Sequence, residues 1–473
     1  LTAALRNDGS SAYSEENRRS WFPKASAAWV FTQAIGQRPW LSYGKLRVAY
    51  GEAGQEPSPY LTSSTFQGNV PLSGITQGTG NLPVQNGLPG LATSITQGAA
   101  DLREERSKEW EAGVVLGLFR DQADLSFTYY HTITDDVILL QPVAPSTGFF
   151  RKANNAAKFR NAGAEVALNI RPITTENFSW DIGLQWAKNK SRVLELGGSE
   201  FVEFDPNSIY TGVAQVGEEV GVLRDFGLVR CGISPNGLSA AIQGVDLATV
   251  CAGQPNGALY IGDDGFPVGD DNPRIVANPN PDWTGSVRTG FRFQRLSVSG
   301  LLDIRHGGQI LNGTKGALLS YGTHAETAER AACSGTPLVC VGNEKVFGTD
   351  IIPGPVVGPG AGLSVPIGEN YYRLGVAPCP FSGYVETCVE DGGFVKLREI
   401  SVGYTLDFPW VQRLLGFSSI DLRVAGRNLK TWTDYTGYDP EINLGGSIQA
   451  TRGVDYFVMP QTRSFLFSVT LNR

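Results

Sequence analysis

The stretch Arg106–Leu140, RSKEWEAGVVLGLFRDQADLSFTYYHTITDDVILL, decides the fold class. Apolar and polar residues alternate in it on both sides of a break at Arg120–Gln122. Successive side chains of a β-strand point to opposite faces, so this pattern predicts a hairpin with one apolar and one polar face. Each strand is long enough to cross a bilayer. The apolar face carries Trp110, Ala112, Val114, Leu116, Leu118, Ala123, Leu125, Phe127 and Tyr129, and the polar face carries Glu109, Glu111, Asp124, Ser126 and Thr128.

The same alternation recurs along the whole chain and predicts about twelve strands. The alternation is a weak signal in any one segment, but it is a strong signal when it recurs in about twelve segments. The remaining segments are 1–6, 22–31, 44–53, 161–172, 178–190, 285–294, 296–305, 395–406, 419–429 and 463–473. In several of them one face is apolar and the other is charged, as in Ile420, Leu422 and Val424 against Asp421 and Arg423.

Composition excludes several classes of protein. The length of 473 residues allows two to four ordinary domains, but 58 glycines, one methionine and only 18% charged residues favour strands and turns over helices. No run of 18 apolar residues is present, so no transmembrane helix is predicted. The net charge of −7 gives no reason to expect a nucleic-acid partner.

The connections between the predicted strands alternate between short and long. Three are very long, at 54–102, 197–282 and 307–392, and loops of that length are rare in compact soluble domains. Outer-membrane barrels have short periplasmic turns and long extracellular loops. We therefore predict an all-β chain that forms a transmembrane antiparallel β-barrel. A soluble β-sandwich is the main structural alternative, but its strands average only about 5–6 residues. A propeller would need a regular repeat, which is not visible.

In such a barrel the apolar face meets lipid and the polar face lines a hydrated lumen. The predicted lumen-facing residues are Glu109, Glu111, Asp124, Arg288, Arg292, Arg423 and Arg427. Two roles are open for the four arginines. They could bias the channel toward anionic solutes. Alternatively, they could pair with Glu109, Glu111, Asp421 or residues of a plug inside the barrel, and we favour pairing.

All six cysteines lie in the predicted long loops, where an oxidising exterior would favour disulfides. They are Cys231, Cys251, Cys333, Cys340, Cys379 and Cys388. Pairing of nearest neighbours gives Cys231–Cys251, Cys333–Cys340 and Cys379–Cys388, and a Cys340–Cys379 bond is the main alternative. The three histidines are scattered and the sequence has no C-x-x-C pair, so a zinc site is not expected.

Several stretches resemble the SusC/RagA-type TonB-dependent outer-membrane transporters. They include LRVAYGEAGQ, LREERSKEWEAGVVLGLF, FRNAGAEVALNI, NPNPDWTGSVRTGF, LREISVGYTL and RVAGRNLKTWTDYTGYDPE. The resemblance extends over residues 1–473 in the family's order. It implies a 22-stranded barrel around an N-terminal plug, a SusD-like surface lipoprotein as partner, and TonB-driven import of oligosaccharides or peptides in a Gram-negative outer membrane.

Twelve strands would correspond to the C-terminal part of that barrel, with the plug and the N-terminal strands absent from this sequence. We therefore expect the chain to be a fragment. TonB would act through that missing N-terminal part. No catalytic constellation stands out, so an enzyme is not expected.

Two loops carry candidate binding residues. In TWTDYTGYDPEINLGG, Trp432, Tyr435 and Tyr438 could stack on ligand while Asp434, Asp439 and Glu441 accept hydrogen bonds, although we favour a role in packing the loop. In YIGDDGFPVGDDNPR, four carboxylates, Asp263, Asp264, Asp270 and Asp271, could hold calcium, but the EF-hand spacing is not met.

Three functional alternatives remain open at this stage. The first is a siderophore or cobalamin receptor of the same barrel type without a lipoprotein lid. The second is a structural or adhesive surface protein that uses the barrel as an anchor. The third is a soluble carbohydrate-binding β-protein.

Overall fold

The structure is a computed structural model, and it describes residues 1–36, 38–68, 91–204, 212–234, 245–335, 339–373, 384–446 and 451–473. One large antiparallel sheet runs through it, with the strand order β1-β2-β3-β7-β8-β9-β10-β16-β17-β25-β26-β28. These twelve strands are the twelve predicted from the alternation. Their bounds are β1 Thr2–Gly9, β2 Arg19–Val30, β3 Leu41–Gln55, β7 Glu105–Leu118, β8 Ala123–Pro142, β9 Arg151–Thr174, β10 Phe178–Leu196, β16 Trp283–Phe293, β17 Leu296–His306, β25 Phe394–Leu406, β26 Ser419–Trp432 and β28 Ser464–Asn472.

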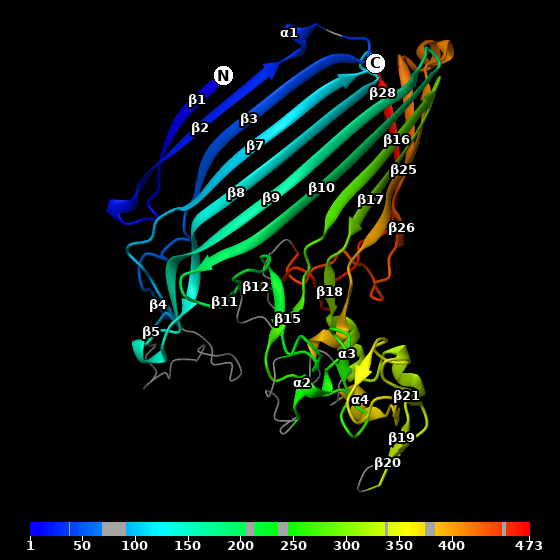
Figure 1. The fold of residues 1–473 in the computed structure, drawn as a ribbon. Helices are drawn as coiled ribbons and strands as arrows, with labels where there is room; N and C mark the ends of the chain where they lie inside the picture. The colour runs from blue at the N-terminus through cyan, green and yellow to red at the C-terminus, as the bar shows by residue number, and fades with distance from the viewer. Residues whose placement is uncertain are drawn as a thin grey trace.

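The sheet is curved, with short turns at one end and the long loops gathered at the other (Figure 1). The hairpin quoted above forms β7 and β8, which pair from Arg106 opposite Asp135 to Leu118 opposite Ala123. Its turn has positive φ at Phe119, Arg120 and Asp121, and the Phe119 N–H donates to the Trp40 carbonyl. The predicted break therefore lies at the short-turn end of the sheet.

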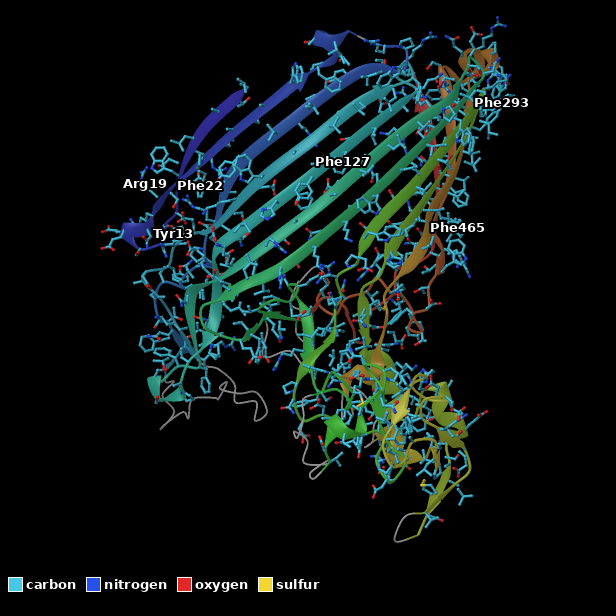
Figure 2. The ribbon with its side chains drawn as sticks, viewed as in Figure 1. Tyr13, Arg19, Phe22, Phe127, Phe293 and Phe465 are labelled. Atoms are coloured by element: carbon cyan, nitrogen blue, oxygen red, sulfur yellow. A yellow bond between two sulfur atoms is a disulfide. The ribbon has the colours of Figure 1, made fainter. Side chains whose placement is uncertain are left out.

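The large apolar side chains of the sheet lie on one face and remain exposed. One ladder of paired positions runs from Trp180 through Phe291 and Val298 to Val402, Val424 and Phe467. Phe127, Phe293 and Phe465 project from the same face and are 38%, 55% and 63% exposed (Figure 2). A soluble protein rarely exposes so large an apolar surface. This face is the one that a barrel turns toward lipid.

The buried hydrophobic clusters lie in the loops and at the outer ends of β8, β9 and β10. One is built entirely from loop segments around Leu228, Ile261, Leu319, Phe347 and Ile367. Strands β8, β9 and β10 have 20, 24 and 19 residues, whereas a bilayer needs only about 9–11. Their outer ends therefore extend beyond the membrane.

The loops contain short strands and helices. The strands are β4 Phe66–Gly68, β5 Leu91–Thr93, β6 Thr96–Gln97, β11 Phe201–Glu203, β12 Gly212–Gln215, β13 Val222–Asp225, β14 Leu259–Tyr260, β15 Arg274–Ala277, β18 Gln309–Asn312, β19 Ala332–Ser334, β20 Val339–Val341, β21 Glu344–Val346, β22 Val356–Val357, β23 Ser364–Pro366, β24 Val389–Asp391 and β27 Val454–Asp455. The helices are α1 Thr32–Ile35, α2 Leu247–Val250, α3 Gly313–Ser320 and α4 Glu369–Arg373, with short helical turns η1 Glu15–Asn17, η2 Pro145–Thr147, η4 Ala325–Glu329, η5 Val385–Cys388 and η6 Val411–Leu415. None of the helices in the described ranges combines the length and hydrophobicity needed to cross a membrane.

Candidate functional site

The polar face of the sheet brings together the residues predicted to face the lumen. It contains three hollows of about 440, 480 and 390 Å³. Glu109 and Glu111 line the first, and Arg288, Arg292 and Arg423 line the third. Charged side chains reach these hollows because each strand contributes every second side chain to this face.

The arginines on this face have ion-pair partners other than the ones named from the sequence. Arg423 and Arg427 both contact Glu399, at 3.0 Å each. Arg288 lies 3.6 Å from Asp181, and Arg292 makes no ion pair with any described residue. The expected carboxylates are used elsewhere. Their contacts are Glu111 with Arg47, Glu109 with Thr132, and Asp421 with Thr405 and Asn472. Asp124, predicted only to face the lumen, contacts Arg171.

A β-bulge in β25 brings a further charged residue to this face. The register of β25 with both neighbours shifts between Leu397 and Glu399, so the extra residue, Arg398, and Glu399 both contact groups on the polar face. Arg398 reaches Asp303, at 2.7 Å, and Glu441, at 2.5 Å. Two adjacent charged residues, Arg398 and Glu399, interrupt the alternation of this strand. That interruption is the sequence signal from which the bulge could have been predicted.

Next to the bulge, a network of charges fastens the last long loop, residues 433–461 between β26 and β28, to the sheet. The Lys396 ammonium donates to Asp439, at 2.5 Å, and to Glu441, at 2.8 Å, and the Lys396 side chain is only 4% exposed. Burial alone would raise the pKa of Glu441, but hydrogen bonds from Arg398 and Lys396 outweigh it and lower that pKa to about 2. Glu441 therefore remains ionised. The sequence reading did not identify Lys396, Arg398 or Asp303 as partners of this loop.

The six candidate ligand residues of this loop divide into two groups. Tyr435, Asp439 and Glu441 make internal contacts, and the buried Tyr435 hydroxyl donates to Asp455 at 2.6 Å. Burial and this hydrogen bond raise the pKa of Tyr435. In contrast, Trp432, Asp434 and Tyr438 are exposed. A ligand contact stays a prediction, and these three side chains are the accessible ones.

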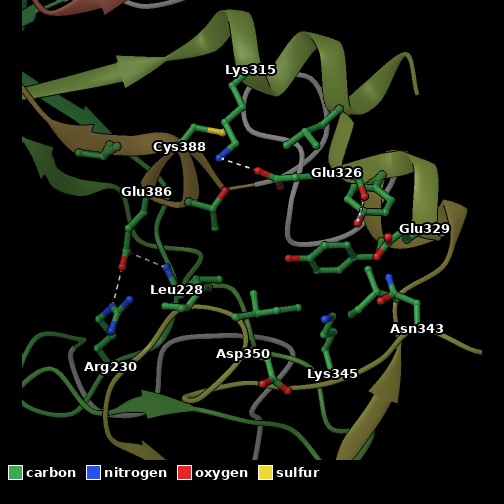
Figure 3. A pocket seen from close by; sticks show the side chains of 18 residues that line it. Leu228, Arg230, Lys315, Glu326, Glu329, Asn343, Lys345, Asp350, Glu386 and Cys388 are labelled. Atoms are coloured by element: carbon green, nitrogen blue, oxygen red, sulfur yellow. Dashed lines mark hydrogen bonds and ion pairs between the residues drawn. The ribbon is translucent and has the colours of Figure 1, made fainter. Parts of the chain in front are cut away.

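A cavity of about 710 Å³ lies in the outer loops (Figure 3). Its walls come from the segments 228–230, 315–329, 343–352, 367–372 and 386–389. Glu386 contacts Arg230 and Arg274 at 2.5 and 2.6 Å, and Lys315 lies 3.1 Å from Glu326. These ion pairs connect segments that are distant in sequence. The sequence reading had singled out none of the residues that line this cavity except Cys388.

Disulfides reinforce the loops around the cavity. The predicted bonds Cys231–Cys251 and Cys333–Cys340 are confirmed. The alternative Cys340–Cys379 bond is wrong, because Cys340 is paired with Cys333. Cys388 is disulfide-bonded, and its predicted partner Cys379 lies outside the described residues.

The four carboxylates considered for calcium have different surroundings. Asp270 is buried, with a 3.2 Å contact to Arg274, whereas Asp263, Asp264 and Asp271 are exposed. Within the described part of the chain, no three His, Cys, Asp or Glu side chains converge as a metal site would require. The calcium prediction gains no support from this arrangement.

Comparison with known proteins gives one consistent family. A family model described as TonB dependent receptor-like, beta-barrel, matches residues 1–328. TonB-dependent receptor P3 of Formosa agariphila is 27% identical over 100% of this chain and 44% of its own length. TonB-dependent receptor SusC of Bacteroides thetaiotaomicron is 26% identical over 42% of this chain and 20% of its own length.

Solved structures of RagAB resemble this chain in fold. The structure of the RagAB peptide importer in its closed-closed state matches with a TM-score of 0.68 and 18% identity, covering 99% of this chain and 45% of that one. A second RagAB structure, in the open-open state, matches with a TM-score of 0.66. The chain thus spans less than half the length of the relatives and solved structures that it matches.

Proposed function

Because the chain belongs to the TonB dependent receptor-like, beta-barrel family, as a SusC/RagA-type outer-membrane barrel, we propose that the protein carrying it is an active nutrient importer driven through TonB. The family is one of receptors and transporters rather than enzymes. In this proposal the chain supplies part of the barrel wall and the extracellular loops. Coupling to TonB is assigned to the N-terminal part of the family's architecture.

The observation that carries the proposal is the division of the sheet into two faces. Its apolar face exposes Trp110, Phe127 and Phe467 at 59%, 38% and 74%. Its polar face contains charged hollows. A barrel built from such a sheet has a hydrated interior wide enough for a solute path once a plug moves.

The substrates proposed are oligosaccharides or peptides, delivered with a SusD-like lipoprotein as partner. Similarity to SusC and to the RagAB peptide importer supports this choice. The fastening of the 433–461 loop to the sheet through Lys396 and Arg398 supports it further. A loop held by three ion pairs offers a firm base on which a partner can dock.

The test is uptake by cells that carry the complete gene. A strain lacking the gene should lose uptake of a labelled oligosaccharide mixture or of a labelled peptide mixture, and the restored gene should recover it only when TonB is present. Copurification of a SusD-like lipoprotein with the tagged protein should accompany uptake. Uptake that does not depend on TonB would contradict energy coupling, and ferric siderophore as the only transported solute would favour the siderophore alternative.

A further inference from the structure

The 710 Å³ cavity of the outer loops is a partly open hollow between folded loop segments. Its walls include Leu228, Leu319, Ile367 and Tyr372, all buried members of one hydrophobic cluster. The Tyr372 hydroxyl donates to the Glu326 carbonyl at 3.0 Å. A cavity whose walls are packed in this way pays little ordering entropy when a ligand enters.

Most charges around this cavity are already neutralised, but a few are not. Glu386 is held by Arg230 and Arg274, and Lys315 by Glu326 and Glu390. Among the described residues, Lys345, Glu329 and Asp350 also line the cavity and have no ion-pair partner, and Asp350 accepts a hydrogen bond from the Val346 N–H at 2.9 Å. Of these three, the Lys345 ammonium and the Glu329 carboxylate form neither an ion pair nor a side-chain hydrogen bond with a described residue (Figure 3).

Tyr371 adds a hydroxyl group to the cavity. It lines the cavity and forms no hydrogen bond with any described residue, although burial raises its pKa. Its ring is in contact with Phe266, Phe347 and Tyr372, at centroid distances of 6.4, 6.2 and 5.2 Å. The aromatic surface is therefore used for packing, and the hydroxyl is the part available to a ligand.

We infer that this cavity binds a short peptide with free termini, with Glu329 facing its ammonium, Lys345 its carboxylate and the aliphatic wall an apolar side chain. This inference rests on the proposed import function and selects one of its two substrate classes. A neutral oligosaccharide carries neither charge, and it prefers a free aromatic face on which to stack, which the packing of Tyr371 does not provide. Pockets of this size gain specificity from a few polar groups set in an apolar wall.

The experiment uses the complete protein in detergent and the tripeptide Ala-Leu-Ala as probe, with maltoheptaose as the neutral comparison. Lys345→Gln and Glu329→Gln should each weaken tripeptide binding roughly tenfold or more, because each removes a charge-assisted hydrogen bond. Tyr371→Phe should weaken it roughly threefold to tenfold. Lys430→Gln and Glu176→Gln, exposed residues outside the cavity, are matched controls that should bind like the wild type.

Blocking the termini of the tripeptide gives the second measurement. An N-acetylated tripeptide should bind equally to wild type and Glu329→Gln, and a C-amidated one equally to wild type and Lys345→Gln. Wild-type affinity in both charge variants, or maltoheptaose binding that these variants weaken, would overturn the inference. If TonB-dependent uptake of peptides or oligosaccharides persists while these variants have no effect, the cavity assignment fails and the import function stands. If no TonB-dependent uptake of either class is found, the import function itself fails.

Discussion

Replacing Lys396 with methionine should release the last long loop from the sheet. The methionine keeps the length of the side chain but leaves Asp439 buried without its cation, which now lies 2.5 Å away. Removing one partner of a buried ion pair costs roughly 3–5 kcal/mol. Glu441 keeps Arg398 and is 29% exposed, so we take the lower end, about 3 kcal/mol, which raises the open population of the loop roughly 100-fold.

Hydrogen exchange of the complete protein in detergent measures this opening. Amides of Asp439–Leu444 should exchange roughly 100-fold faster in Lys396→Met, whereas amides in β9 should be unchanged. Lys430→Met, at an exposed position of the neighbouring strand, is the control and should behave like the wild type. Adding Asp439→Asn to Lys396→Met should recover part of the protection, because the unpaired charge is gone. Unchanged exchange in the single variant, or no recovery in the double variant, would refute the reasoning.

Three further predictions follow from the loop contacts and the two faces. The pKa of Glu441 is lowered from 4.5 to about 2, so its stabilising contribution is present above about pH 4.5 and is lost as the pH falls toward 2. Digestion of the loop by pepsin should accelerate over that range, and Glu441→Gln should remove the pH dependence. Leu184→Arg, on the apolar face of β10, should cost roughly 2–4 kcal/mol in urea unfolding of the bilayer-inserted protein, whereas Gln185→Arg, on the polar face, should stay within about 0.5 kcal/mol; equal effects would contradict the face assignment. Replacing Cys333 and Cys340 with serine should destabilise their loop by about 2 kcal/mol, seen as faster proteolysis there and not in the barrel strands.

The twelve strands were predictable because each presents one face to lipid and the other to water, and that demand imposes a period of two on every crossing. The same demand makes the loop lengths informative, since short turns and long loops lie on opposite sides of the membrane. Trp110 and Glu109 could therefore be assigned to opposite faces from the sequence alone.

The contacts between loops could not be predicted in this way. The partners of Lys396, namely Asp439 and Glu441, are more than 40 residues distant in sequence, and no periodicity links them. The cavity likewise joins Leu228 to Glu386 through a 3.0 Å hydrogen bond across 158 residues. Such contacts depend on how the irregular loops fold against each other. The nearest-neighbour disulfides were the exception, because a short loop limits the choice of partner.

The bulge at Arg398 shows where the alternation itself fails. A single extra residue lets Arg398 reach Asp303 and Glu441 while its neighbour Glu399 pairs with Arg423 and Arg427. Arg288, Arg423 and Arg427 thus pair with carboxylates other than Glu109, Glu111 and Asp421, and pairing with plug residues stays a prediction.

The most direct test of the two-faced sheet is spin-label accessibility at Arg423 and Val424. These neighbours on β26 are both exposed and lie on opposite faces. In the complete protein in a lipid bilayer, a label at Val424→Cys should collide with oxygen far more often than with a water-soluble nickel complex. A label at Arg423→Cys should show the reverse preference. Equal access of the nickel complex to both labels, or a higher nickel access at Val424→Cys, would contradict the account.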